Sequence, residues 1–76
     1  MLKEHASVVL TQDLPASGRE AGDVGVVVHV HRNGEAYEVE FLSLDGATVA
    51  VETPSAQQVR AADQHDILHV RQARGA

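Results

Sequence analysis

Apolar and polar residues alternate over residues 22–51 in a pattern typical of two consecutive β-hairpins. The first strand runs from Gly22 to His31, the chain turns at Asn33-Gly34, and the second strand returns over residues 36–41. Asn-Gly is the strongest short-range hairpin signal because both central residues of a type I′ turn need a positive φ. A two-residue loop predicts three apolar pairs on one face: Val30 with Tyr37, Val28 with Val39, and Val26 with Phe41.

The opposite face of this hairpin is predicted to face water. It carries Val27 opposite Glu40, His29 opposite Glu38, and His31 opposite Ala36. A three-residue loop would pair Val28 with Glu38 and mix the two faces, since a slip of one residue sends each side chain to the other side. The pattern therefore favours the two-residue loop.

The second turn, at Leu44-Asp45-Gly46, favours a longer loop. A two-residue Asp-Gly loop would place Phe41 against Ala50 and turn two valines outward with Leu42. A three-residue loop with a left-handed Gly46 in a bulge keeps one apolar face. That loop pairs Phe41 with Val49 and Val39 with Val51, and it turns Thr48, Ala50, Glu52 and Leu42 outward.

Shorter elements are predicted on either side of the two hairpins. They are a strand over residues 7–12, a polar loop over 13–21, one 3₁₀ turn within 53–59 whose Val59 closes the barrel end, and a fifth strand over 66–71. A short amphipathic helix over 61–72 is the alternative to that strand. The ends, 1–6 and 72–76, are expected to be loosely ordered. We predict a single all-β domain over 1–76, a small five-stranded SH3-like barrel.

Several blocks resemble a family of small bacterial SH3-like proteins known only as a domain of unknown function, DUF4926. The blocks are residues 9–15, 22–25, 36–41, 44–46 and 66–71. The resemblance covers nearly the whole chain and implies no activity. Gly22-Asp-Val-Gly25, followed by valines, is also similar to the KOW motif of ribosomal and transcription-elongation barrels, and to the SH3-like part of nitrile hydratase β subunits.

The net negative charge of the chain makes nucleic-acid binding a less favoured function. Six Lys and Arg against eleven Asp and Glu give a formal net charge of −5, and the arginines are scattered along the chain. Proteins that bind nucleic acid gather basic residues over phosphates, so nucleic acid is an unfavoured partner here. No leader-like segment or apolar run of about 20 residues occurs, which indicates a cytoplasmic protein without a membrane partner.

The chain has few side chains that are candidates for catalysis or for metal binding. It contains no Cys, and no serine lies in a nucleophile-elbow context. His29, His31 and His69 are weak metal candidates because their spacing matches no zinc signature. Glu38 and Glu40 are two apart on one strand face, which is typical of a solvated strand. We expect no catalytic residues, no bound metal and no cofactor.

The remaining hypothesis is recognition of a protein, because small barrels bind through loops and exposed edges. The candidate surface joins an apolar group, Val27, Leu42 and Leu44, to the acidic Glu38 and Glu40. The partner is a second copy, giving a homodimer, or another protein, in one version the target of an antitoxin or immunity-type protein encoded next to it. The alternatives are a KOW-like nucleic-acid or ribosome-associated barrel, and an accessory subunit or small-ligand-binding barrel.

Overall fold

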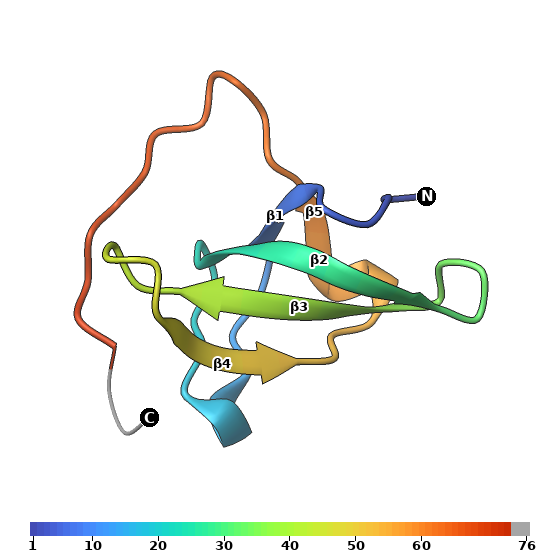
Figure 1. The fold of residues 1–76 in the computed structure, drawn as a ribbon, viewed down its shortest axis with the longest axis horizontal. Helices are drawn as coiled ribbons and strands as arrows, with labels where there is room; N and C mark the ends of the chain where they lie inside the picture. Colours follow the sequence, from blue (N-terminus) through green and yellow to red (C-terminus); the bar gives the residue numbers. More distant parts are fainter. Residues whose placement is uncertain (74–76) are drawn as a thin grey trace.

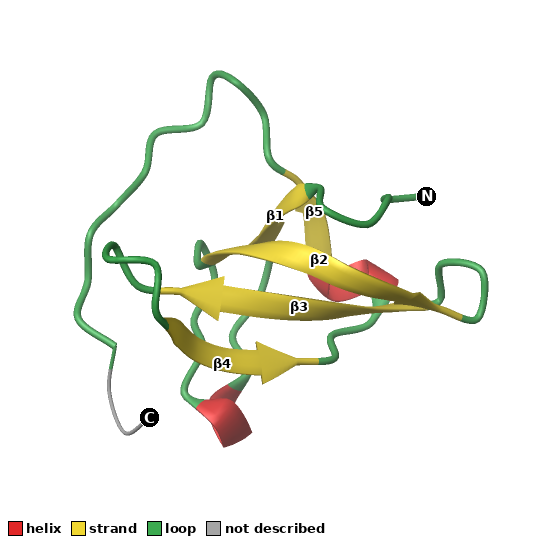
Figure 2. Cartoon of the chain, viewed as in Figure 1, coloured by secondary structure: helices red, strands yellow, loops and turns green. Residues whose placement is uncertain are grey.

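The structure is a computed structural model that describes residues 1–73. Its strands are β1 (Ser7–Leu10), β2 (Val24–His31), β3 (Ala36–Leu42), β4 (Thr48–Glu52) and β5 (Val59–Ala61). Two 3₁₀ turns, η1 (Pro15–Ser17) and η2 (Ala56–Gln58), are the helical elements among the described residues (Figure 2). All strand pairs are antiparallel, in the order β4-β3-β2-β1-β5. The all-β, five-stranded prediction is confirmed, but β4 and β5 remain edges and the sheet does not close into a full barrel.

The sheet curls so that its two ends differ in direction. Figure 1 shows β1 and β5 running steeply across β2, β3 and β4. Apolar side chains from all these strands except β4 fill the inside of the curl. The buried cluster consists of Val8, Leu10, Val27, Tyr37, Val39, Phe41 and Val59. Partly buried Leu2, Leu14, Val30 and Ala56 pack against it.

The turn before β5 follows the sequence prediction. A single 3₁₀ turn, η2, precedes the last strand, and Val59 is buried at its end. Ser55 and Gln58 form a capping box in which the Ser55 N–H donates to Gln58 Oε1 at 2.8 Å. The prediction that Val59 plugs the end of the core is confirmed.

The first hairpin keeps its predicted register only next to the turn. Three predicted pairs are confirmed: His31 with Ala36, Val30 with Tyr37, and His29 with Glu38. Val28 is then an extra residue in a bulge, and the ladder resumes one position out of step. The observed pairs are Val27 with Val39, Val26 with Glu40, and Gly25 with Phe41. The predicted pairs Val28–Val39, Val26–Phe41 and Val27–Glu40 are wrong.

The shift has a physical reason at Gly25. A Cβ at this position would lie 2.5 Å from Val39 Cγ1 and 2.9 Å from the Glu40 carbonyl oxygen. Only glycine fits there, so a residue without a side chain lies opposite Phe41 and leaves room for its ring. The apolar alternation of β2 contains no sign of this constraint.

The turn itself is longer than two residues. Asn33 and Gly34 have the predicted positive φ, 57° and 98°, but Arg32 is also left-handed at 49°. The N–H groups of Gly34 and Glu35 both donate to the His31 carbonyl, at 2.9 and 3.1 Å. Because His31 pairs with Ala36, the loop between them holds four residues, 32–35, which is two more than predicted.

The second hairpin has the predicted turn and a different ladder. Gly46 is left-handed (φ 85°), and the Ser43 N–H donates to the Ala47 carbonyl at 2.9 Å, which confirms the three-residue loop. The register then shifts between Leu42 and Phe41, so that Phe41 pairs with Ala50. The predicted pairs Phe41–Val49 and Val39–Val51 are wrong. Val51 is turned outward, whereas Ala50 and Glu52 lie half-buried on the inner side.

The fifth strand of the structure, β5, does not lie over residues 66–71, where the sequence predicts it. β5 follows η2 directly and pairs with β1, which fills that edge of the sheet. The chain then turns at residues 63–66, where the Asp66 N–H donates to the Asp63 carbonyl at 2.9 Å. Residues 62–73, called the tail below, contain no assigned helix or strand, so both the strand over 66–71 and the alternative helix are wrong. Residues 74–76 of the predicted loose end lie outside the described residues.

The N-terminal segment is bonded to the sheet. The His5 N–H donates to the Val27 carbonyl at 2.7 Å, and the Leu2 N–H donates to the Tyr37 hydroxyl at 3.1 Å. Leu2 is partly buried against the core. Residues 1–6 therefore cover one end of the buried cluster.

Candidate binding surface

The outer face of β2, β3 and β4 is the surface that the sequence prediction singled out. Residues that pair directly across antiparallel strands share a face. The pairs His29–Glu38, Glu40–Val51 and Leu42–Thr48 therefore define this face, and we call it the outer face. Its middle strand, β3, alternates strictly, with Tyr37, Val39 and Phe41 buried on the other side.

Exposed apolar side chains interrupt the acidic residues of the outer face. Val28 is 38% exposed because the bulge turns it out of the ladder, Leu42 is 43% exposed and Val51 is 49% exposed. Leu44, at the tip of the β3–β4 turn, is fully exposed. The predicted outward positions of Leu42 and Leu44 are confirmed, and the structure adds Val28 and Val51.

Val27 does not belong to this surface. Its side chain is fully buried in the core cluster, opposite Val39. The prediction that Val27 faces solvent is wrong because the bulge at Val28 inverts the alternation of β2 on that side. Sequence periodicity had no local signal for this bulge.

The two predicted carboxylates are held by neighbours. Glu38 Oε1 lies 3.3 Å from His31 Nε2, and both side chains are 39% exposed. His29, which pairs with Glu38 in the ladder, instead lies 3.9 Å from Glu4 Oε2 through its Nδ1. The Thr48 hydroxyl donates to Glu40 Oε2. Both glutamates thus keep acceptor oxygens on the outer face in fixed positions.

The histidines do not form a metal centre among the described residues. The rings of His29 and His31 are arranged edge to face with centroids 4.6 Å apart, and His69 lies in the tail. Over residues 1–73, no group of three or more His, Cys, Asp or Glu side chains could hold a metal ion.

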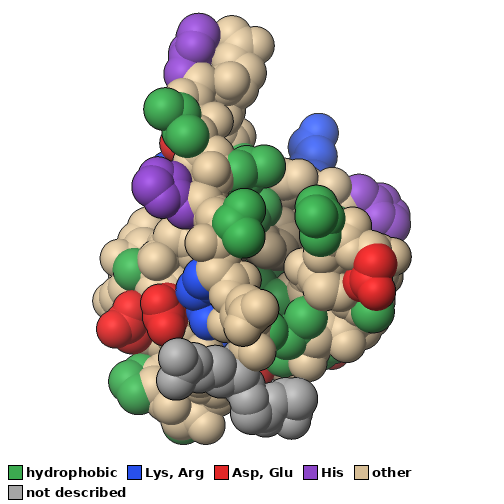
Figure 3. All heavy atoms as spheres, turned by 90° about the vertical axis from the view of Figure 1, so that its left-hand side faces the viewer, with side chains coloured by type: hydrophobic (Ala, Val, Ile, Leu, Met, Phe, Trp, Pro, Cys, Tyr) green, Lys and Arg blue, Asp and Glu red, His purple; other side chains and the backbone are tan. Residues whose placement is uncertain are grey.

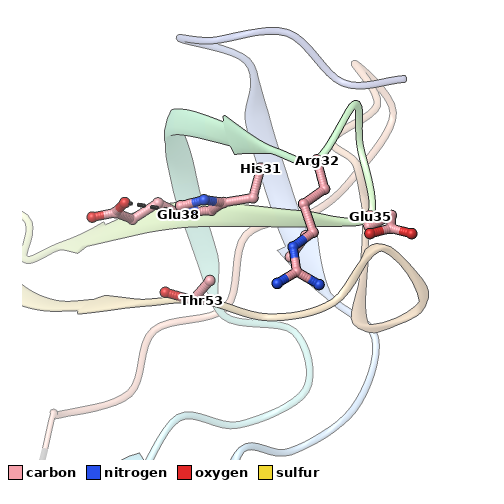
Figure 4. A pocket seen from close by; sticks show the side chains of 6 residues that line it. His31, Arg32, Glu35, Glu38 and Thr53 are labelled. Carbon is pink, nitrogen blue, oxygen red and sulfur yellow. Dashed lines mark hydrogen bonds and ion pairs between the residues drawn. The ribbon is translucent and has the colours of Figure 1, made fainter.

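A shallow hollow adjoins the outer face at the β2–β3 turn. It is lined by His31, Arg32, Glu35, Ala36, Glu38 and Thr53. Figure 4 shows the His31–Glu38 contact along one side of this hollow, with the Arg32 side chain reaching down from the turn. A second shallow hollow lies between the η1 segment and the end of β4. Both are open to solvent.

Most of the basic side chains are paired or buried within the fold. Arg60 makes two 2.9 Å hydrogen bonds to Asp66, and Arg71 donates to both carboxylate oxygens of Asp23. Arg19 is buried at 4% exposure. Within residues 1–73, Lys3 and Arg32 are the other cations, and neither is buried. These pairs use one carboxylate for each arginine, so the acidic excess of the sequence remains on the other carboxylates.

These pairs lower two carboxyl pKa values. The Arg60 hydrogen bond, with the Asp63 N–H, lowers the pKa of Asp66 to about 2. For Asp23, partial burial by itself raises the pKa, but the Arg71 hydrogen bond and the Glu20 N–H outweigh it and lower the pKa overall. The Asp23–Arg71 pair joins residues 48 apart in sequence, so local pattern could not have found it.

The fold and this surface define a small all-β domain with an acidic, partly apolar sheet face. The chain belongs to the family described as Domain of unknown function (DUF4926), whose model matches residues 4–61. The family predicted from the sequence is thereby confirmed. The match ends at Ala61, the last residue of β5, so the block over residues 66–71 lies outside it. No curated protein and no solved structure matched the chain.

Over residues 1–73, no helix has the length and apolar character needed to cross a membrane.

Proposed function

We propose that this protein is a non-enzymatic, cytoplasmic module that binds a protein partner through the outer face. The observation that carries the proposal is the combination of Leu42, Val51 and Val28, all partly exposed, with Glu38 and Glu40 between them. Protein interfaces combine buried apolar side chains with polar groups at their rim. A sheet face with this composition matches that arrangement.

The charge of the face indicates the chemistry of the partner. Arg60 and Arg71 are paired with aspartates and Arg19 is buried, so few cations offset the exposed carboxylates. A basic partner with one or more apolar side chains complements such a face and is attracted to it over long range. In the specific version of this proposal, the chain is an antitoxin or immunity-type protein that covers a basic site on a protein encoded next to it.

The test is co-expression with the products of the flanking genes, followed by calorimetry on any complex. Leu42→Asp is expected to weaken binding by about tenfold or more, because it replaces an exposed apolar side chain of the face by a charge that a partner would have to desolvate. The double variant Glu38→Lys, Glu40→Lys is expected to slow association and to remove the salt dependence of its rate. Leu68→Asp is the matched control, because Leu68 is an exposed leucine of the tail and lies outside the face.

Two results would overturn the proposal. One is that no flanking-gene product binds the chain. The other is a complex whose affinity is the same for wild type, Leu42→Asp and the double variant. Retention of the wild-type circular dichroism spectrum shows that each variant is folded, since these side chains do not contribute to the core cluster.

A further inference from the structure

The tail carries apolar side chains that the fold does not bury. Ile67 is 85% exposed, Leu68 is 74% exposed and Val70 is 98% exposed. Figure 3 shows hydrophobic side chains on the tail and on the neighbouring part of the sheet domain gathered on the same side of the molecule. Exposed apolar side chains that lie close together, and are not scattered singly, mark interaction sites in soluble proteins.

Part of the tail has the alternating pattern of a β-strand, although it pairs with no strand among the described residues. Residues 66–71, Asp-Ile-Leu-His-Val-Arg, place Leu68 and Val70 on one side and Ile67 and His69 on the other. Within residues 1–73, no backbone hydrogen bond from an N–H of residues 67–70 is formed. The pattern that predicted a fifth strand is therefore present, and its hydrogen-bonding groups are available.

Strand β4 has a free edge to which a segment such as residues 66–71 could add. It is an end strand of the sheet, and its sequence Thr-Val-Ala-Val-Glu contains no proline or lysine that would protect an edge. Acidic residues lie on it and beside it, at Glu52 and Glu40. The segment 66–71 brings His69 and Arg71, so its basic end complements this acidic edge.

The tail does not reach β4 of its own copy. It begins after β5, which lies at the opposite end of the sheet order from β4. In Figure 1 it passes outside the β3–β4 turn and does not run along β4. A β4 strand that pairs with residues 66–71 therefore belongs to another molecule.

We propose that residues 66–71 of one copy add as an extra strand to β4 of a second copy, and that the exchange is reciprocal, giving a twofold-symmetric dimer. The occupant of the edge is thus the tail of this same chain. The Arg71–Asp23 pair, whose side chains are 29% and 17% exposed, opens in the process, so the backbone hydrogen bonds of the added strand have to outweigh its loss. This inference concerns the β4 edge and does not depend on the partner proposed for the outer face.

The first test is sedimentation equilibrium of the full chain over a wide concentration range. We expect a species of twice 8.1 kDa. Leu68→Pro is expected to weaken the dimer by at least about tenfold, because proline removes an N–H from the added strand. Gln64→Pro is the matched control: it lies in the same tail at the second position of the 63–66 turn, which accepts proline, and leaves the dimer unchanged.

Disulfide trapping identifies the surfaces in contact, because the chain has no cysteine of its own. Leu68→Cys and Val51→Cys chains are mixed under mild oxidation, and the products are separated by mass. The proposal predicts that the mixed disulfide exceeds both symmetric ones. A chain that remains monomeric at all concentrations, a dimer insensitive to Leu68→Pro, or an excess of the Val51→Cys symmetric product, which indicates β4–β4 pairing, would each overturn it.

The proposed dimer and the proposed protein partner can be tested independently of each other. Leu42→Asp is expected to leave the dimer intact while weakening the protein partner, since Leu42 lies on β3 and not on an edge. Leu68→Pro is expected to do the reverse.

Discussion

Val27 lies directly opposite Val39 in the β2–β3 ladder, and both side chains are fully buried. The neighbour of Val27, Val28, is the extra residue of the bulge and is exposed. Two adjacent valines thus have opposite environments. This contrast provides a direct test of the observed register.

Val27→Ala is expected to destabilise the fold by about 2–3 kcal/mol, because it removes two methyl groups from a filled core and leaves a cavity. Val28→Ala is expected to cost less than about 1 kcal/mol, as is typical of surface substitutions. Urea denaturation of both variants gives the two free energies of unfolding. If Val28→Ala proved the more damaging of the two, the ladder without a bulge would be correct and the outer face would have to be redrawn.

Gly25→Ala is expected to cost roughly 1–3 kcal/mol, because the new methyl group overlaps atoms that cannot all move away. The Val39 side chain can rotate, but the Glu40 carbonyl oxygen, 2.9 Å from where the alanine Cβ would lie, belongs to the backbone. Gly46→Asn is the matched control, since nothing lies within 4 Å of a Cβ there and asparagine tolerates the left-handed φ of 85°. Thermal denaturation compares the two, and equal effects would show that Gly25 has room for a side chain.

The Asp23–Arg71 pair is expected to make stability depend on pH at the acidic end. The folded-state pKa of Asp23 is below the ordinary value of 3.8, so its contribution is complete above pH 3.8. It is lost as the pH falls through the lower folded-state pKa, because protonation then favours the unfolded chain. Asp23→Asn is expected to give a shallower fall in stability below pH 3.8 when urea midpoints are measured at several pH values.

Arg71→Gln is the companion variant for that experiment, because it removes the same pair from the other side. Glu35→Gln serves as a control for the loss of one negative charge. Because this pair opens in the proposed dimer, the measurements are made at concentrations at which the chain is monomeric. A wild-type pH dependence in both Asp23→Asn and Arg71→Gln would then show that the tail of the monomer is not held at Asp23.

The pKa of Asp66 is expected to be about 2 in a carbon-detected NMR titration of its carboxyl group, because Arg60 donates two hydrogen bonds to it. Arg60→Gln is expected to raise that pKa toward 3.8, with little effect on stability, since the pair is exposed. An Asp66 titration midpoint near 3.8 in the wild type would mean that the turn at the start of the tail does not form.

Local sequence determined the features that depend on only a few neighbouring residues. Asn33, Gly34 and Gly46 were predicted to be left-handed, and they are, because positive φ is a property of individual residues. The alternation of β3 correctly placed Glu38, Glu40 and Leu42 outside and Tyr37, Val39 and Phe41 inside. The all-β class, the 3₁₀ turn before the last strand and the position of Val59 followed from the same local rules.

The tertiary structure decided which residues lie opposite one another. The close packing of Gly25 against Val39 and Phe41 joins β2 to β3, and alternation within one strand does not encode it. The bulges in β2 and β4 shift the register of both hairpins. They moved Val27 into the core and Val51 out of it. The edge of β1 is occupied by β5, which follows η2 directly, and not by residues 66–71, which lie beyond the turn at residues 63–66. The Arg71–Asp23 contact depended on the folded path of the whole chain. Such contacts join residues far apart in sequence, and their energy exists only once the intervening chain has folded.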